Sequence, residues 1–279
     1  MDILARLQEL RQAGTPCALV TVTHTQGSIP RHAGAKMIIT EEDTHDTVGG
    51  GKFEDLVIAD ARAAIAAVAS GSADAAGTSK AAVSRTYPLH EHSADSFGAI
   101  CGGEVTVFIE AFLPPAHLYL VGGGHCAQAV AALAGTLGFA VTVFDDRPAF
   151  RDAFADSVRY VEAPLNAQAL PEAFRASDAV AVMSRNPQID TEAVAAVVGR
   201  SDLRYLGMIG SKKKIKTVFA ELASRGVAAS ELARIKAPIG LDIGADTPAE
   251  IAVAVMAEIL QARRRPSAAS DQCSAFGRE

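Results

Sequence analysis

A turn of three consecutive glycines, Gly122-Gly123-Gly124, has the residue pattern that binds phosphate groups in many nucleotide-binding proteins. It follows the apolar run Leu118–Val121 and precedes a helical pattern in which Ala127 takes the third small position of a G-x-G-x-x-A motif. Gly122 would permit a tight turn, and Gly124 would let backbone amides approach a pyrophosphate at the N-terminus of the helix. The pattern predicts a strand, a phosphate-binding turn and a helix, in that order.

The chain beyond this helix supplies an acid of the type that holds a ribose. A second apolar run, Phe139–Phe144, ends at Asp145, 23 residues after Gly122. In dinucleotide-binding domains a carboxylate at about this spacing accepts hydrogen bonds from the ribose and favours NAD over NADP. The nearby Arg147 would partly offset that preference. The whole unit predicts a Rossmann-like fold, with NAD(P) as one candidate ligand.

A second glycine turn, Gly49-Gly50-Gly51, leads into another helical pattern, with Glu54 in its first turn. Three glycines can expose successive amides to an anion. The turn is not a P-loop, because Phe53 stands where Ser or Thr would bind magnesium. Two interpretations stay open, an anion site or a tight turn capped by a favourable acid, and the motif by itself favours the second.

Two further segments place polar and basic side chains where they can bind an anion. The turn from Gly27 presents the hydroxyl of Ser28 and the guanidinium of Arg31, which can fork onto a phosphate or carboxylate. Ser211 is followed by three lysines, Lys212–Lys214, which oppose the macrodipole at the start of a helix. A bound anion would relieve that penalty. A solvated basic surface is the alternative for both segments.

Among the four cysteines, Cys101 is the candidate for chemistry. It precedes two glycines that leave its sulfur accessible, so a thiolate there could hold or pass sulfur or ligate a soft metal. A small buried packing residue is the equally weighted alternative. Cys17 and Cys126 are expected to pack in the core, and Cys273 to lie in a tail without a function.

Composition narrows the class of protein. With 49% hydrophobic and 21% charged residues, the 279-residue chain can bury a sizeable core, and its net charge of −6 argues against a sequence-wide nucleic-acid surface. No uninterrupted apolar stretch reaches the ~18 residues of a membrane span. The N-terminus lacks a signal-peptide core, and the absence of a C-x-x-C pair fits a reducing compartment. We therefore expect a cytoplasmic protein that binds neither nucleic acid nor membrane.

The chain is predicted to form two domains. Residues 1–113 mix strands and helices without a Rossmann pattern, which indicates a small α+β domain. Two prolines within Leu113–Ala116 mark the boundary. Residues 117–262 alternate strands and helices, as expected for a Rossmann-like, doubly wound parallel sheet. Residues 263–279 are charged and rich in small residues, which indicates a disordered tail.

The hydrophobic periodicity also indicates approximate element boundaries. Met1–Gly14 is predicted as an amphipathic helix with Ile3, Leu4, Leu7 and Leu10 on one face, and Thr247 and Glu250 form a predicted capping box. Further helices are expected at 53–70, 190–199, 212–225 and 248–263, and strands at 17–23, 35–40, 81–87, 104–112, 178–183 and 205–209.

Taken together, these motifs resemble the xanthine dehydrogenase accessory protein family, the XdhC-type molybdenum-cofactor insertion chaperones. They extend from about residue 15 to 262 and form a specific set. The resemblance is carried by Gly27-Ser-Ile-Pro-Arg31, Gly49–Glu54, Cys101-Gly-Gly-Glu104, Gly122–Arg147, Gly210-Ser211 with its lysines, and Ala237–Ile251.

The resemblance implies a function as well as a fold. Family members bind the molybdenum cofactor, support its sulfuration by a cysteine desulfurase and deliver it to apo-xanthine dehydrogenase, so the protein would be an accessory chaperone rather than an enzyme. A cleft between the two domains could shield the cofactor. The residues expected to hold it are Ser28, Arg31, Gly49, Gly50, Gly51, Glu54, Gly122, Gly123, Gly124, Asp145, Arg147, Ser211 and Lys212, with Cys101 handling sulfur or contacting molybdenum.

One segment departs from the family pattern. The family often has a histidine after the fourth Rossmann strand, and this chain has Ser184-Arg185-Asn186-Pro187 there. A role that needs an imidazole is therefore in doubt, while Arg185 could still bind a terminal phosphate.

Two other functions stay open. One is an NAD(P)-dependent oxidoreductase, which the glycine turn and Asp145 favour, although the sequence offers no convincing proton-transfer pair for it. The other is a nucleotide-sensing regulatory module. We expect the protein to form a homo-oligomer whichever of these functions it has.

Overall fold

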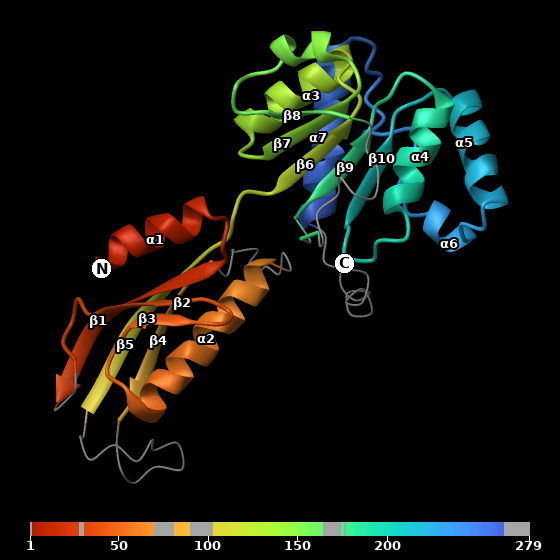
Figure 1. Ribbon diagram of the computed structural model, residues 1–279. Helices are drawn as coiled ribbons and strands as arrows, with labels where there is room; N and C mark the ends of the chain where they lie inside the picture. Colours follow the sequence, from red (N-terminus) through yellow and green to blue (C-terminus); the bar gives the residue numbers. More distant parts are fainter. Residues whose placement is uncertain are drawn as a thin grey trace, which may run out of the picture. The chain divides into compact units, whose positions relative to one another are not determined.

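The computed structural model describes residues 2–27, 31–69, 81–89, 103–163, 174–175 and 177–264. The chain divides into two compact units, Met1–Pro114 and Pro115–Glu279 (Figure 1). The division falls between two prolines, which interrupt regular secondary structure. Each unit has its own sheet and its own hydrophobic core.

The first unit is built on an antiparallel sheet in the order β3-β2-β1-β5-β4. The longest pair is β1 with β5, whose register extends from Cys17 opposite Phe112 to Gly27 opposite Gly103. The elements are α1 (Ile3–Gln12), β1 (Cys17–Gly27), β2 (Lys36–Ile39), β3 (Thr44–Asp46), α2 (Gly51–Ala69), β4 (Ala82–Pro88) and β5 (Gly103–Phe112). The predicted small α+β fold of this part of the chain is confirmed.

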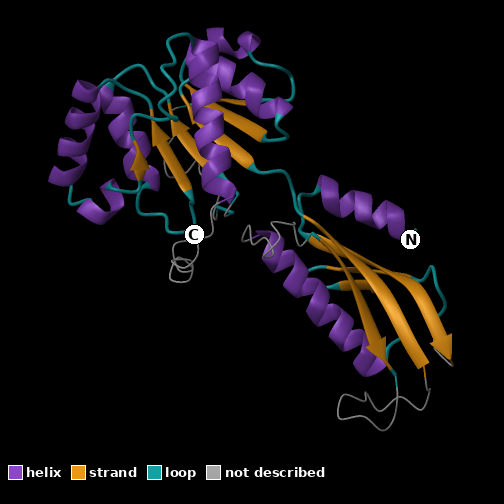
Figure 2. Ribbon diagram, turned by 180° about the vertical axis from the view of Figure 1, so that it is seen from behind, coloured by secondary structure: helices purple, strands orange, loops and turns teal. Residues whose placement is uncertain are grey.

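Side chains of β1 alternate between the two faces of this sheet, as strand geometry requires. Ala18, Val20 and Val22 belong to the core that includes the buried face of α2, whereas Cys17 and Leu19 pack with Leu10 of α1. Figure 2 shows these two helices on opposite faces of the sheet. The sheet is therefore covered on both sides.

The predicted apolar face of α1 is wrong at one position. Ile3, Leu7 and Leu10 follow the helical spacing and pack together, but Leu4 is 54% exposed. Successive helical residues are turned by ~100°, so Leu4 lies at the margin of the face that Ile3, Leu7 and Leu10 share.

The second unit contains a parallel sheet in the order β11-β10-β9-β6-β7-β8. Numbered by their succession in this unit, the strands run 6-5-4-1-2-3, which is the Rossmann order. The strands are β6 (His117–Val121), β7 (Ala140–Asp145), β8 (Arg159–Glu162), β9 (Ala179–Val182), β10 (Tyr205–Met208) and β11 (Ile235–Lys236). The predicted α/β fold with a Rossmann-like second part is confirmed.

Helices cover both faces of the parallel sheet. Helices α3 and α7 share one core with the sheet, and α4 and α5 share the other (Figure 1). The helical elements are α3 (His125–Thr136), η1 (Pro148–Ala153), α4 (Pro187–Val197), α5 (Lys212–Ser224), α6 (Ala229–Leu232) and α7 (Pro248–Arg264). Helix α7 has the predicted capping box, since Thr247 N donates to Glu250 Oε2 over 2.9 Å and Glu250 N donates to Thr247 Oγ1 over 3.3 Å.

Some boundaries differ from those expected. Helix α4 begins at Pro187 instead of residue 190, because Asn186 caps it by accepting a hydrogen bond from the Ile189 amide. Strand β1 continues to Gly27 because β5 pairs with its whole length. The short strands β3, β8 and β11 were not expected, and they belong to the sheets through pairing with a neighbour.

In the described parts of the chain, no helix is long and apolar enough to cross a membrane.

Candidate functional site

The loops that carry the predicted phosphate motif meet at the carboxyl edge of the parallel sheet. Gly122–Gly124 follows β6, Asp145 ends β7 and is followed by Asp146 and Arg147, Ser184–Asn186 follows β9, and Ile209–Ser211 follows β10. The strand succession reverses between β6 and β9, and α/β proteins bind ligands in the crevice outside the strands at such a point. The glycine turn therefore lies at the ligand-binding position of the fold.

The backbone at position 122 requires glycine. Its φ is +102°, and a β-carbon there would lie 2.6 Å from the carbonyl oxygen of Met183, at the end of β9. Its amide donates to the Phe144 carbonyl oxygen over 2.8 Å. This glycine joins the ends of three strands, and its role is in packing.

Gly124, two residues later, faces open space. It is the N-cap of α3 with an ordinary φ of −68°, and a β-carbon built on it would meet nothing within 4 Å. No side chain caps α3. Ala127 is fully buried and lets helix and sheet pack closely, as predicted. The start of α3 thus combines open space with backbone amides that have no side-chain partner among the described residues, the arrangement in which helices bind anions.

The carboxylate of Asp145 is bound by groups of the protein itself. Asp145 is 5% exposed, and its carboxylate accepts hydrogen bonds from the Gly123 amide (2.6 Å) and from the amide, Nε and a terminal nitrogen of Arg147 (3.0, 2.8 and 2.7 Å). Partial burial acts to raise the pKa of Asp145, but these hydrogen bonds outweigh it and hold the pKa below its ordinary value. The carboxylate expected to grip a ribose is already satisfied within the protein.

Arg147 is itself held in place. Its guanidinium lies 4.2 Å from the centre of the Phe150 ring, and its carbonyl oxygen accepts a 2.7 Å hydrogen bond from the hydroxyl of Tyr160. Burial and the nearby Asp145 raise the pKa of Tyr160 to about 12, so this hydroxyl stays a donor. The pair of Asp145 and Arg147 is a fixed part of the edge.

A second ion pair crosses the glycine turn. Arg185, after β9, donates to both carboxylate oxygens of Asp146, after β7, over 3.0 and 2.8 Å. Strand β6 lies between β7 and β9 in the sheet. The contact therefore bridges the carboxyl end of β6, and Arg185 pairs with a carboxylate where the sequence suggested a phosphate.

The ends of β9 and β10 are joined by a buried charge cluster that no sequence pattern above predicted. Asp190 is fully buried, accepts a hydrogen bond from the Ser184 hydroxyl and lies 2.5 Å from Nζ of Lys214. Lys214 also donates to the carbonyl oxygens of Ser184 (3.0 Å) and Ile209 (3.4 Å). The Asn186-Pro187 pair, an N-cap followed by proline, could have placed Asp190 in the first turn of α4.

The basic segment at the start of α5 separates into different roles. Ser211 caps the helix by accepting a hydrogen bond from the Lys214 amide over 3.3 Å. Lys214 belongs to the buried cluster, whereas Lys212 and Lys213 are exposed and make no ion pair in the described parts of the chain. Lys212 is therefore the predicted cofactor-binding lysine that keeps a free charge near the edge.

The glycine turn of the first unit is closed by its own carboxylate. Glu54 accepts hydrogen bonds from the amides of Val48 and Gly50, each over 3.0 Å, and from the Thr47 hydroxyl. Partial burial acts to raise the pKa of Glu54, but these hydrogen bonds lower it overall. The structure supports the interpretation of a tight turn capped by an acid, because the partners of Glu54 are backbone amides and a hydroxyl of the turn itself.

The remaining predicted residues have less support from their surroundings. Arg31 is half exposed and lies 3.9 Å from a carboxylate oxygen of Asp46 in the first unit. Ser28 and Cys101 lie outside the described residues, as does Cys273. Cys17 is buried and Cys126 partly buried, and burial raises the pKa of both thiols, which fits packing roles. Within the described ranges, no cluster of three or more His, Cys, Asp or Glu residues could hold a metal.

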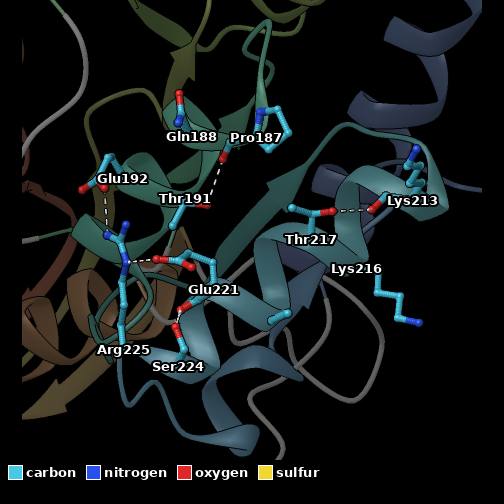
Figure 3. Close-up of a pocket in the computed structure, with 11 residues that line it drawn as sticks. Pro187, Gln188, Thr191, Glu192, Lys213, Lys216, Thr217, Glu221, Ser224 and Arg225 are labelled. Atoms are coloured by element: carbon cyan, nitrogen blue, oxygen red, sulfur yellow. Dashed lines mark hydrogen bonds and ion pairs between the residues drawn. The ribbon is translucent and has the colours of Figure 1, made fainter.

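A groove of about 910 Å³ lies between α4 and α5 in the second unit (Figure 3). Arg225 joins the two helices by pairing with Glu192 (2.8 Å) and Glu221 (3.0 Å). The hydroxyls of Thr191 and Thr217 donate to backbone carbonyl oxygens of their own helices (2.8 and 3.1 Å). These polar groups already have partners within the protein, whereas Lys213 and Lys216 also line the groove and make no ion pair in the described parts of the chain.

Comparison with known families covers most of the chain. Residues 118–259 match the model described as the XdhC Rossmann domain, and residues 10–85 match the model described as the XdhC and CoxI family. The first match begins in β6 and ends in α7, and the second begins in α1 and ends in β4.

Two curated proteins are similar to this chain. One is named "Uncharacterized protein YqeB" from Escherichia coli (strain K12), 29% identical over 270 residues, covering 94% of this chain and 46% of that protein. The other is named as a probable xanthine dehydrogenase subunit from Bacillus subtilis (strain 168), 32% identical over 165 residues, covering 57% of this chain and 46% of that protein. The chain thus spans about half the length of the curated relatives it matches.

Among solved structures, a crystal structure described as a xanthine dehydrogenase from Bacillus halodurans is similar over 98% of both chains. The TM-score is 0.48 and the sequence identity 19%.

Proposed function

The chain belongs to the XdhC family, and from that premise we propose that it is an accessory protein of a xanthine dehydrogenase that holds the phosphate end of the molybdenum cofactor at the start of α3. The observation that carries the proposal is the open, uncapped N-terminus of α3 beside Gly124, inside the part of the chain that matches the XdhC Rossmann domain. The Bacillus subtilis relative, named as part of a probable xanthine dehydrogenase, supports the choice of recipient enzyme.

The residues present fit a phosphate-bearing cargo. Amides at the start of a helix favour an anion, and only a residue without a side chain at Gly124 leaves room for phosphate oxygens against the backbone. Lys212, exposed at the start of α5, adds positive charge at the same edge of the sheet. When bound, the cofactor would supply a pterin dithiolene and its molybdenum as cargo. The protein's residues would bind and orient the phosphate group.

The proposal also includes a sulfur donor and two residues of the first unit. We propose that a cysteine desulfurase supplies sulfur while the cofactor is held, and that Cys101 is the cysteine that handles it. In the first unit, Arg31 is half exposed and would contact an anionic group of the cofactor. In this role the protein would act as a carrier, without catalysing a reaction of its own, in a homo-oligomer in the cytoplasm.

Cofactor retention tests the proposal directly. Protein made in a host that produces molybdenum cofactor should give more Form A fluorescence after oxidation than protein made in a cofactor-deficient host. Gly124→Val places two methyl groups in the open space at the N-cap and should lower retention by tenfold or more, with folding checked by circular dichroism and thermal melting.

Gly135→Val is the matched control for this variant. Gly135 lies near the other end of α3, and a β-carbon there also meets nothing within 4 Å. It should therefore carry the same added bulk without loss of cofactor. Equal fluorescence from the two hosts, or full retention by a folded Gly124→Val variant, would refute cofactor binding at this turn.

A further inference from the structure

The crevice of a Rossmann domain normally accepts a dinucleotide, and here two arginines occupy the positions that a dinucleotide needs. We propose that Arg147 and Arg185 are specificity-determining residues that close this crevice to dinucleotides, so that the domain accepts ligands ending in a phosphate group. The exclusion of dinucleotides is inferred from the contacts of the two arginines. The preference for a ligand that ends in a phosphate group rests on the function proposed above.

Arg147 removes the ribose acceptor. A carboxylate has about four acceptor sites, and Asp145 already receives four hydrogen bonds, three of them from Arg147. Two of these come from the guanidinium as a forked, charge-assisted pair. A ribose hydroxyl would have to displace this pair, which Phe150 stabilises from the other side. The subsite that reads adenosine ribose in such folds is filled by an arginine of the same chain.

Arg185 closes the path across the switch point. A dinucleotide lies with its two halves on either side of the first strand of the unit, which here is β6. Strands β7 and β9 flank β6 at two strand spacings, about 10 Å apart. The bidentate pair between Asp146 and Arg185 joins the loops that follow these two strands. A ligand that extends to both sides of β6 must break it.

Neither arginine covers the start of α3 itself. A β-carbon on Gly124 meets nothing within 4 Å, so the open space at the N-cap stays accessible beside both ion pairs. A ligand that ends at its phosphate needs only this one side of the crevice. The same geometry that excludes the nucleoside half of a dinucleotide thus leaves room for a phosphate monoester.

Titration with NADH, followed by its fluorescence, tests the closure. The unmodified protein should show no binding at millimolar NADH. Arg147→Gln frees the Asp145 carboxylate and should raise NADH affinity by at least tenfold, with less gain for NADPH because that carboxylate repels a 2′-phosphate. Arg151→Gln is the matched control, since Arg151 lies in the short helix η1 that Arg147 caps, is exposed and contributes no side-chain contact to Asp145.

Two variants test the bridge while keeping Arg147, whose loss leaves a buried carboxylate short of partners. Asp146 also lies 3.9 Å from Nε of Arg147, so Arg185→Gln is the variant that leaves the contacts of Arg147 intact. Arg185→Gln and Asp146→Asn both cut the exposed pair but change the net charge in opposite directions. A gain of NADH binding in both supports closure by the bridge, because a general charge effect would move the two variants oppositely. Micromolar binding of NADH by the unmodified protein, or no gain in folded variants that lack either or both contacts, would overturn the proposal.

Failure of the proposed closure and failure of the proposed function give different results. If Arg147→Gln gains NADH binding while the unmodified protein retains no molybdenum cofactor, the closure stands and the cofactor assignment falls. If cofactor is retained and NADH also binds the unmodified protein, the cofactor assignment stands and the closure falls.

Discussion

The two glycine turns of this chain have similar sequences and different surroundings. Gly49–Gly51 and Gly122–Gly124 each precede a helix, and in each a carboxylate of the protein accepts hydrogen bonds from backbone amides of the turn. In the first turn Glu54, on the helix itself, accepts from the Val48 and Gly50 amides. In the second, Asp145 comes from the neighbouring strand and accepts from the Gly123 amide, so that it lies beside the helix start and no side chain caps α3.

The two turns differ in where their carboxylate comes from, and we expect this origin to decide whether a glycine turn can bind an external anion. An acid in the first turn of the helix lies where the anion would lie and takes its hydrogen bonds. An acid delivered by the next strand holds the turn from the side, and the helix amides stay available. The chemistry of the second turn therefore depends on the charged residues around it, which suggests four tests.

The largest loss of stability is expected at the buried charge cluster that joins the ends of β9 and β10, beside the second turn. Lys214→Met leaves the fully buried Asp190 without its cation, and breaking such a pair from one side typically costs about 3–5 kcal/mol of unfolding free energy. Urea denaturation measures the loss. The double variant Lys214→Met with Asp190→Asn should recover part of it, because no buried charge is then left unpaired. A single variant as stable as the unmodified protein would contradict a structural role for the cluster.

Within the second turn, the two outer glycines should respond differently. Gly122→Ala forces a β-carbon against the Met183 carbonyl oxygen at a positive φ, and we expect a loss of about 3 kcal/mol from strain and overlap together. Gly124→Ala meets open space at an ordinary φ and should cost less than about 1 kcal/mol. Thermal melting of both variants gives the comparison, and equal losses would remove the distinction between a packing glycine and a ligand-facing glycine.

The first turn should depend on Glu54 to a smaller extent. Glu54→Gln keeps an acceptor oxygen but removes the charge that satisfies the Val48 and Gly50 amides, and caps of this kind contribute about 1 kcal/mol. Chemical denaturation should therefore show a modest loss at neutral pH. Asp55→Asn, one residue along the same exposed helix turn, serves as the control and should change stability little. A loss of several kcal/mol would mean that this turn depends on its carboxylate as strongly as the second depends on its charged cluster.

The smallest difference is expected in the acid dependence of these variants. The pKa of Glu54 is lower in the folded protein than the ordinary value of 4.5, so its contribution is present above that value and is lost as the pH falls through the folded pKa. Unfolding free energy of the unmodified protein should therefore decline more steeply below pH ~4.5 than that of Glu54→Gln. Parallel curves for the two proteins would show that Glu54 gains nothing from its hydrogen bonds.

The sequence was sufficient for the fold of the second unit and for the place of its glycine turn. Alternating apolar runs, the G-x-G-x-x-A spacing and the capping box at Thr247 are local patterns, and the chain satisfies them locally. The start of α4 was misplaced although the Asn186-Pro187 signal was present, and Leu4, at the margin of the apolar face of α1, was assigned to that face although it is exposed. These errors concern the use of local patterns.

The partners of the charged residues were decided by the tertiary structure alone. Asp145, Asp146 and Asp190 look alike in the sequence, yet their carboxylates pair with Arg147, Arg185 and Lys214 at quite different burial. Two of these pairs join segments more than twenty residues apart, because parallel strands bring distant loops to one edge of a sheet. A spacing rule can predict that an acid ends a strand. Whether that acid meets a ligand or an arginine depends on which loops the sheet order places beside it.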